Sequence, residues 1–197
     1  MLMEIAVVDY KGGNVQSVLF ALERLGAQPI LTADPEVLRR ADKVLFPGEG
    51  EASSAMEALR AAGLDKVLPT LTQPFLGICL GMQLLGQHSE ENDTPMLGLL
   101  PFTVRRFAPD PSHKVPHKGW NNLQDLQGPL FAGLTEADHM YFVHSYYAPV
   151  GIYTTAQASH PAPFSAAVQH GNFHGVQFHA EKSGAVGTRI LANFLDL

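Results

Sequence analysis

The chain has 197 residues, 46% of them hydrophobic and 16% charged, and its formal net charge is −6. These values are typical of one globular domain, which we expect to span residues 1–197. The acidic charge, with no run of lysines and arginines, argues against nucleic acid as a partner. The apolar run before Asp9 is too short for a signal peptide, and no stretch of about 18 apolar residues predicts a membrane span. A single cysteine can form no internal disulfide, so we expect a cytoplasmic protein.

Short apolar runs alternate with helical patterns in the N-terminal half. Strands are predicted at 3–8, 29–31, 43–46 and 75–78, and helices at 15–25, 53–62 and 80–87. Asn14 is placed to cap the first helix, and Asp34-Pro35-Glu36 predicts a cap followed by a proline at the first helical position. Strands that alternate with helices imply a parallel sheet covered on both faces.

After Leu99 the pattern changes to strands joined by short turns. These strands are predicted at 102–107, 140–144, 153–158, 164–169 and 173–179, before a closing helix at 183–195. The predicted fold class is therefore α/β: a flavodoxin-like three-layer sandwich with a mainly parallel central sheet, and antiparallel hairpins added in the C-terminal half. Ligand sites in such open sheets lie at the carboxyl ends of the strands.

The only cysteine, Cys79, follows the fourth predicted strand and lies between Gly77 and Gly81. Burial as a small apolar side chain explains most free cysteines, and remains the alternative here. The spacing Gly-x-Cys-x-Gly, however, is the cysteine counterpart of the nucleophile elbow, in which a strand turns sharply into a helix. The glycines avoid a collision between a Cβ and neighbouring backbone. In such an elbow the N–H of Leu80 is the natural first oxyanion donor.

A nucleophilic cysteine needs a base and a group that orients it, and both can come from far along the chain. His179 and Glu181 lie two residues apart, so in an extended segment they point to the same side. A polar strand end on the surface is the alternative interpretation. Gly48-Glu49-Gly50 follows the third strand and could supply the second oxyanion donor, or could serve only as a connecting turn.

Nine histidines raise the question of a metal site. His113 and His117 lie four residues apart, as do His170 and His174, but neither pair has a third or fourth ligand at a defined spacing. We therefore expect neither a metal nor another cofactor.

The motifs GICLGMQ around Cys79 and QFHAEKS around His179 are similar to the most specific motifs of the class I (triad) glutamine amidotransferases. Three further segments resemble the glutaminase subunits of imidazole glycerol phosphate synthase, a branch of this family in histidine biosynthesis. They are DYKGGN from Asp9, PHKGWN from Pro116 and YFVHSY from Tyr141. The resemblance runs from about residue 4 to the C-terminus.

The resemblance implies a glutaminase that hydrolyses L-glutamine to L-glutamate and ammonia through a thioester. Cys79 is the nucleophile, His179 the base and Glu181 its orienting group. The N–H groups of Leu80 and of the loop Gly48, Glu49 and Gly50 would hold the oxyanion. The residues that would bind the substrate's amino-acid end are Gln83, Glu91, Ser145 and Tyr146, the last two through their backbone. Glu90 is the alternative to Glu91 in this role.

The same resemblance implies a heterodimer with a (β/α)8-barrel cyclase that receives the ammonia. Candidate interface residues are Asn14, Trp120 and Lys182, although a tryptophan buried in the core is an equally ordinary interpretation.

Four residues depart from the family pattern: Lys11, Glu49, Lys118 and Ala180. Glu49 matters most, because a carboxylate aimed at an oxyanion would oppose catalysis. We expect its side chain to point away from the oxyanion, toward a partner or solvent.

Three alternatives stay open at this point. The chain could be the glutaminase of another synthase, such as those for anthranilate, aminodeoxychorismate or pyridoxal phosphate. It could be an unrelated cysteine hydrolase that acts on peptides or other amides, or a binding protein whose Cys79 is inert.

Overall fold

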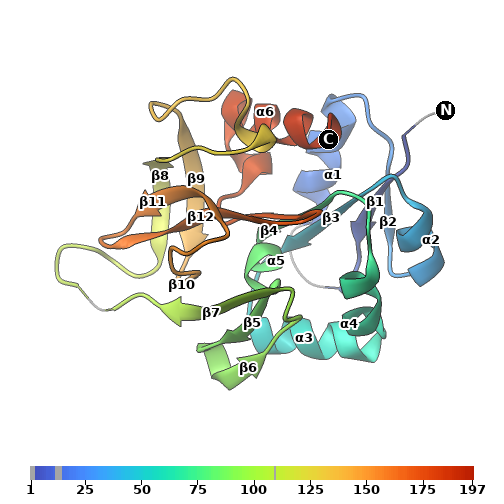
Figure 1. Ribbon diagram of the computed structural model, residues 1–197, viewed down its shortest axis with the longest axis horizontal. Coiled ribbons are helices and arrows are strands. Elements are labelled where there is room, and N and C mark those ends of the chain that lie inside the picture. Colours follow the sequence, from blue (N-terminus) through green and yellow to red (C-terminus); the bar gives the residue numbers. More distant parts are fainter. Residues whose placement is uncertain (1–2, 12–14, 109) are drawn as a thin grey trace.

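The computed structural model describes residues 3–11, 15–108 and 110–197. A seven-stranded sheet in the order β11-β12-β13-β4-β3-β1-β2 runs through the middle of the molecule (Figure 1). Five neighbouring strands are parallel: β1 (Ile5–Val8), β2 (Pro29–Thr32), β3 (Lys43–Gly48), β4 (Phe75–Cys79) and β13 (Phe173–Val176). Two antiparallel strands extend the sheet beyond β13, namely β12 (Pro163–His170) and β11 (Thr154–Ser159).

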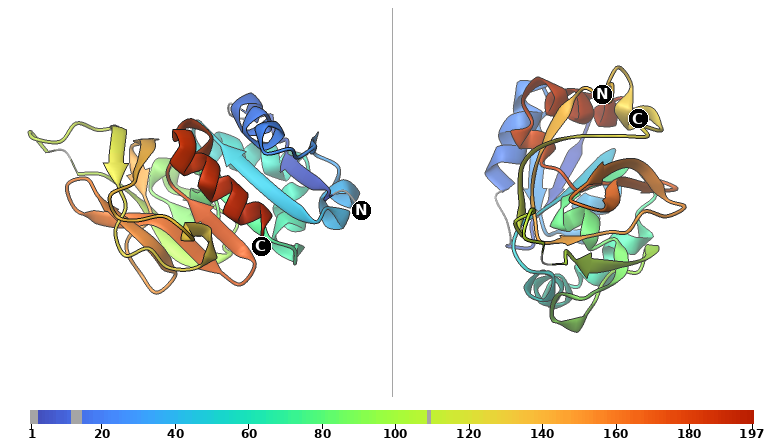
Figure 2. Two further views of the ribbon diagram at one scale, coloured as in Figure 1. Left: turned by 90° about the horizontal axis from the view of Figure 1, so that it is seen from above. Right: turned by 90° about the vertical axis from the view of Figure 1, so that its left-hand side faces the viewer.

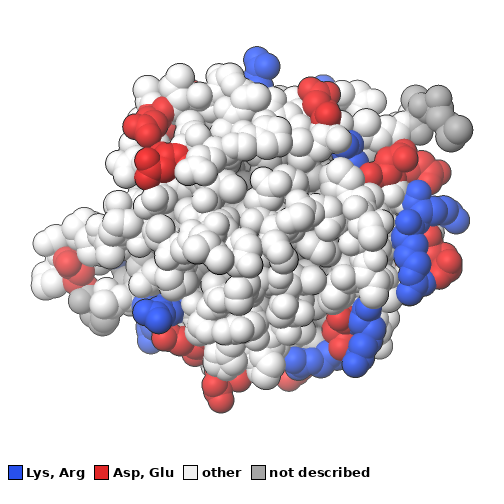
Figure 3. All heavy atoms as spheres, viewed as in Figure 1, with Lys and Arg blue, Asp and Glu red and all other residues white. Residues whose placement is uncertain are grey.

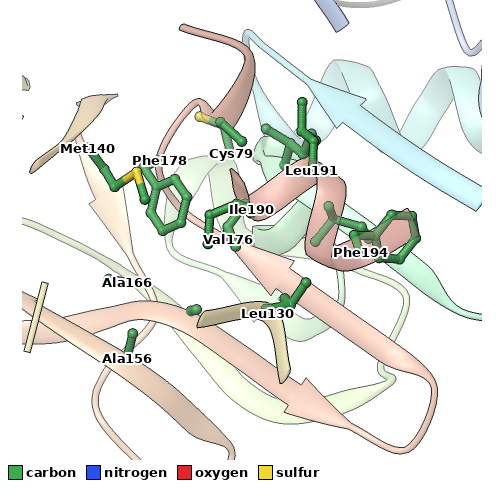
Figure 4. Packing of buried hydrophobic residues seen from close by; sticks show 14 of the residues in the cluster. Cys79, Leu130, Met140, Ala156, Ala166, Val176, Phe178, Ile190, Leu191 and Phe194 are labelled. Atoms are coloured by element: carbon green, nitrogen blue, oxygen red, sulfur yellow. The ribbon is translucent and has the colours of Figure 1, made fainter. Parts of the chain in front are cut away.

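Helices cover both faces of this sheet. One face carries α1 (Val15–Arg24) and α6 (Gly184–Leu195), which lie side by side in the left view of Figure 2. Buried side chains of α6, including Ile190, Leu191 and Phe194, lie beside Val176 of β13 in this layer (Figure 4). The other face carries α2 (Pro35–Arg40), α3 (Ala52–Ala61), α4 (Leu64–Val67) and α5 (Leu80–Gln83). The predicted three-layer α/β class is confirmed.

The additional strands form two smaller sheets. The first has the order β10-β7-β5-β6, with β10 (Tyr146–Tyr147), β7 (Leu100–Arg106), β5 (Gly86–Ser89) and β6 (Thr94–Pro95). The second is the antiparallel ribbon of β8 (His117–Asn122) and β9 (His139–His144). Short 3-10 helices occupy Leu68–Thr70, Glu91–Asp93, Pro129–Phe131 and Ala180–Lys182.

The start of α2 follows the local sequence signal. The Asp34 side chain accepts a hydrogen bond from the N–H of Glu36 at the start of α2, as predicted from the cap sequence. The predicted cap at Asn14 lies outside the described residues. No helix in the described part of the chain is long and apolar enough to cross a membrane. On the face drawn in Figure 3, charged side chains of both signs gather at the rim.

Two predicted elements were too long. The helix predicted at 80–87 ends at Gln83, because the chain turns there and Gly86 enters β5 against the ring of Phe102. The carbonyl oxygen of Leu85 accepts hydrogen bonds from the backbone N–H groups of residues 99 and 100, which fixes this turn. The strand predicted at 173–179 ends at Val176, so the three residues after it form a loop at the sheet edge.

The elbow after β4 depends on two close backbone approaches. A Cβ on Gly81 would lie 1.9 Å from the carbonyl oxygen of Phe46, and one on Gly77 would lie 2.5 Å from the carbonyl oxygen of Gly81. Both distances are far below a van der Waals contact, so only glycine fits. The first turn of α5 is therefore pressed directly against β3 and β4.

We predict that Gly81→Ala lowers the free energy of unfolding by about 2 kcal/mol or more, because β3 or α5 must shift to admit the methyl group. Urea denaturation measures this change. Gly151→Ala is the control, since a Cβ at Gly151 meets nothing within 4 Å, and should change stability by less than about 0.5 kcal/mol. Equal stability of the two variants would contradict the packing that we describe.

Candidate active site

The carboxyl ends of three neighbouring parallel strands meet at one edge of the sheet. Cys79 ends β4, Gly48 ends β3 directly opposite it in register, and His179 follows β13 on the other side. These segments border a cavity of about 420 Å³, whose lining includes Cys79, Leu80, His179 and Lys182. The strand order thus brings together residues that lie a hundred positions apart in the sequence.

Cys79 has an unusual backbone conformation, with φ 55° and ψ −110°. A residue other than glycine adopts such a backbone conformation at a cost of about 1–3 kcal/mol, and it stays there only when the surrounding structure enforces it. In this chain the enforcement comes from the packed glycines on either side. Although Cys79 belongs to the edge of the apolar core, its sulfur turns away from Leu191 of α6 (Figure 4). This is the geometry of a nucleophile elbow rather than of a cysteine that only fills space.

His179 and Glu181 form a buried pair beside the cysteine. Nδ1 of His179 lies 2.8 Å from Oε1 of Glu181, and each side chain is 2% exposed. The predicted reason for this contact was wrong: Glu181 lies in the short 3-10 helix Ala180–Lys182 and not in an extended segment. Nε2 of His179 makes no hydrogen bond to any described residue, so this nitrogen remains available for proton transfer.

The surroundings of His179 favour its protonated form. Burial alone would lower its pKa, but Cys79 and the carboxylate of Glu181 outweigh burial and raise the pKa from 6.5 to about 10. At neutral pH the imidazole is therefore protonated, and it can give a proton to a leaving group.

Glu49 turns toward Lys182. Its Oε1 lies 2.5 Å from Nζ of Lys182 and 3.9 Å from Nδ1 of His179. It forms no hydrogen bond with Cys79 among the described contacts, in keeping with the expectation that this carboxylate avoids the oxyanion. Its partner, however, is a lysine of the same chain. Glu49 and Gly50 border the same cavity as Leu80, whose N–H lies in the first turn of α5.

Four residues predicted to contact a substrate also border the cavity: Gln83, Glu91, Ser145 and Tyr146. Burial raises the pKa of Glu91, and the N–H of Ala52 that donates to its Oε2 partly offsets this effect. The competing carboxylate of Glu90 does not border the cavity and accepts instead from the N–H of Arg106. The structure therefore favours Glu91.

The carbonyl of Tyr146 is already occupied. It accepts hydrogen bonds from Gln83 Nε2 at 2.8 Å and from His144 Nδ1 at 2.7 Å. The carbonyl of Ser145 likewise accepts from the N–H of Phe107. The backbone carbonyls of this segment thus hold the cavity wall in place.

The predicted interface residues differ in their surroundings. Trp120 on β8 is 58% exposed and packs edge-on against Tyr141, so it is not the core tryptophan of the alternative interpretation. Lys182 borders the cavity and binds Glu49. Asn14 lies outside the described residues.

A cation would find poor ligands here. Among the described residues, ligand atoms of Glu49, His179 and Glu181 lie within 4.8 Å of one another. Lys182 already neutralises Glu49, however, and Glu181 already holds Nδ1 of His179. The residues His113 and His117, considered for a metal, are instead parts of an aromatic cluster with His160.

Gln177 is a site residue that the sequence did not reveal. Its Nε2 lies 3.7 Å from the sulfur of Cys79, and its side chain is fully buried. Its place as the first residue of the motif QFHAEKS was the only available signal, because a glutamine carries no spacing pattern of its own. Its contact with Cys79 comes from the pairing of β13 with β4.

Comparison with known proteins gives the family of this chain. The family model described as glutamine amidotransferase class-I matches residues 6–197. This chain belongs to the class-I glutamine amidotransferases. Relatives named imidazole glycerol phosphate synthase subunit HisH include one from Bacteroides thetaiotaomicron, 50% identical over 99% of this chain and 100% of that protein. Another, from Xylella fastidiosa, is 49% identical over 98% of both chains.

Solved structures agree at the level of the fold. A crystal structure of a glutamine amidotransferase superposes on 97% of this chain with a TM-score of 0.76 at 20% sequence identity, and the alignment covers 97% of that chain. This amidotransferase therefore keeps the family architecture.

We predict different roles for the two carboxylates near His179 of this amidotransferase. Glu181→Gln should lower the rate of glutamate release from glutamine by about a hundredfold or more, because the imidazole loses the group that orients it. Glu49→Gln should lower this rate by only about threefold, because that carboxylate lies farther from Nδ1 and binds Lys182. Steady-state assays, with thermal unfolding as a check on folding, measure both. A larger loss of rate in Glu49→Gln than in Glu181→Gln would contradict this prediction, because Glu49 would then be the residue that orients the imidazole.

Proposed function

We propose that this chain is the glutaminase subunit of an imidazole glycerol phosphate synthase, and that Cys79, His179 and Glu181 are its catalytic triad. One observation carries the proposal: Cys79 and His179 line the same cavity, and the buried Glu181 holds Nδ1 of His179. The branch of the family is inferred from relatives named as subunits of that synthase, which are about half identical to this chain over nearly its full length. A free thiol at the centre of the reaction suits a reducing compartment, and we place the protein in the cytoplasm.

The first half-reaction forms a thioester. The sulfur of Cys79 attacks the side-chain carboxamide carbon of L-glutamine, and the carbonyl oxygen takes up negative charge. The N–H of Leu80 and an N–H of the loop Gly48, Glu49 and Gly50 stabilise this charge as preorganised donors. When the intermediate collapses, the C–N bond breaks and Nε2 of His179 gives its proton to the departing ammonia.

The second half-reaction returns the enzyme to its starting state. His179, now neutral, removes a proton from water, and the resulting hydroxide attacks the γ-glutamyl thioester. The C–S bond breaks, L-glutamate leaves, and the thiolate of Cys79 is again paired with the protonated imidazole. Throughout, Glu181 holds Nδ1–H of His179 and stabilises the positive charge on the ring.

The substrate's amino-acid end binds to cavity residues other than the triad. Both N–H groups of Gln83 are already used, by the carbonyl of Tyr146 and by Oε1 of Gln177. Its own Oε1 is therefore the atom that accepts from the substrate's ammonium group. Glu91 lines the same cavity as a second acceptor, and the backbone of Ser145 and Tyr146 closes this side.

The ammonia must reach its acceptor without entering bulk water, where it would be protonated and lose its nucleophilicity. We propose that a (β/α)8-barrel cyclase seals the subunit and uses the ammonia to make imidazole glycerol phosphate and an aminoimidazole carboxamide ribotide. The exposed Trp120 is the proposed anchor of this heterodimer, since exposed aromatic residues that become buried often dominate binding. Lys182, at the border of the cavity, would face the partner beside it.

Glutamate release with and without the cyclase tests this function. We expect the cyclase with its ribotide ligand to stimulate release at least about tenfold, because partner binding completes a site that is slow alone. Cys79→Ala should abolish release in both conditions. If this cyclase did not stimulate glutamate release, and the synthase subunit of another glutamine-dependent pathway did, the assignment would be overturned.

A further inference from the structure

A line of buried hydrogen bonds connects β8 to the sulfur of Cys79. Asn121 Nδ2 lies 3.4 Å from His117 Nε2, and His117 Nδ1 lies 3.0 Å from His144 Nε2. His144 Nδ1 lies 2.7 Å from the carbonyl oxygen of Tyr146. Each of the two histidine side chains is about 95% buried, so water does not compete for these contacts.

The line continues from the same carbonyl through two glutamines. Gln83 Nε2 bonds to the Tyr146 oxygen at 2.8 Å and to Gln177 Oε1 at 2.9 Å. Gln177 Nε2 then lies 3.7 Å from the sulfur of Cys79. The two amides and the sulfur thus extend the histidine pair into the active site.

One atom fixes the direction of every bond in this line. A backbone carbonyl can only accept, so the atoms that approach the Tyr146 oxygen must be N–H donors. His144 therefore carries its proton on Nδ1 and accepts at Nε2, which makes His117 a donor through its own Nδ1. On the other side Gln83 donates to Gln177 Oε1, which leaves the amide nitrogen of Gln177 facing the sulfur.

We propose that Gln177 is a further catalytic residue, a hydrogen-bond donor to the Cys79 thiolate. His117 and His144 are positioning residues that hold the Tyr146 carbonyl, the acceptor on which the direction of the Gln177 amide depends. This proposal rests on the proposed function, in which Cys79 is the nucleophile. A donor to sulfur stabilises the thiolate over the thiol. His144 also bonds to the Tyr146 oxygen and so helps to hold this carbonyl where Gln83 can donate to it. Without that bond the peptide can turn, and the amides of Gln83 and Gln177 lose the acceptor that sets their direction.

The charge state of the histidines suits this role. Burial lowers the pKa of His144 to about 3, and burial together with the neighbouring His160 lowers that of His117 to about 4. Both rings therefore stay neutral at physiological pH, and each keeps one donor and one acceptor. A protonated ring would have two donors facing each other and would break the line.

The short length of α5 gives such a donor more weight. This helix has only four residues, so its dipole gives the thiolate little support compared with the longer helix that the sequence predicted. The charged groups near the sulfur are His179, two residues after Gln177 on the same loop, its partner Glu181, and the cavity residues Glu49, Glu91 and Lys182. The described side-chain hydrogen bonds of Gln177 go to Gln83 and Cys79 and to none of these groups, so a change at Gln177 leaves their contacts in place.

Alkylation of Cys79 by iodoacetamide tests the proposal directly, because the chain has no other cysteine. In this reaction the thiolate forms a carbon–sulfur bond and iodide leaves. Gln177→Met should lower the alkylation rate at pH 7 about tenfold and move the rate–pH profile to higher pH, because the thiolate loses its donor. The readout needs neither glutamine nor a cyclase, so its failure is distinguishable from failure of the proposed function.

Two variants at His144 test the positioning role even if Gln177→Met does not fold. His144→Phe should lower the alkylation rate about threefold, because it removes the donor to Tyr146. His144→Asn should restore most of the rate, since its amide N–H reaches the place of Nδ1. His174→Asn is the control: this buried histidine of β13 lies outside the line, and its variant should alkylate as the wild type does.

Alkylation profiles of Gln177→Met and His144→Phe that superpose on the wild-type profile would overturn the proposal. An equal loss in His144→Phe and His144→Asn would also overturn it, because the direction of the bond at Tyr146 would then not matter. Thermal unfolding of each variant shows which proteins are folded and can be compared.

Discussion

The close packing of α5 against β3 is the constraint on which the active site depends. A Cβ on Gly81 would lie 1.9 Å from the carbonyl oxygen of Phe46, and one on Gly77 would lie 2.5 Å from the carbonyl oxygen of Gly81, so neither residue can carry a side chain. Between these two contacts the chain turns at Cys79 with a positive φ. The strain at one residue is thus held by ordinary backbone contacts in the core, and it places the sulfur at the edge of the cavity.

The parallel sheet supplies the remaining parts of the site. Because β3, β4 and β13 are neighbours, their carboxyl ends bring the proposed oxyanion loop, nucleophile and base to the same place. Electrostatics then separates the histidines by role. Cys79 and Glu181 raise the pKa of His179, whereas burial lowers the pKa values of His117 and His144. We propose that the ring of His179 transfers protons and that the other two rings only hold hydrogen bonds.

Much of this arrangement could be predicted from the sequence because its signals are local. Glycines spaced around Cys79 indicate an elbow, alternating apolar runs indicate the parallel sheet, and Asp34 with Pro35 marks a helix start. The ribbon of β8 and β9 was only half predicted, because HKGWNN is polar and contains a glycine although its partner strand is apolar. The contact between His179 and Glu181 was predicted, but from an extended conformation that the chain does not adopt.

Other features depend on contacts between distant segments and left no local signal. The pairing of Glu49 with Lys182 joins loops 133 residues apart, and the contact of Gln177 with Cys79 spans 98 residues. The end of α5 at Gln83 is set by the packing of Gly86 against Phe102, which overrides the helical pattern that continues to Gln87. Sequence patterns predict elements and motifs, whereas these contacts depend on the tertiary packing of segments that are far apart in the chain.

The central claim is that the strained Cys79 forms a covalent γ-glutamyl intermediate. Radiolabelled glutamine, added to the active enzyme and quenched in acid, tests it most directly when the labelled peptides are mapped. The account predicts label on the peptide that contains Cys79, and none in Cys79→Ala. Rapid glutamate release with label on another residue, or with no covalent label at all, would contradict it.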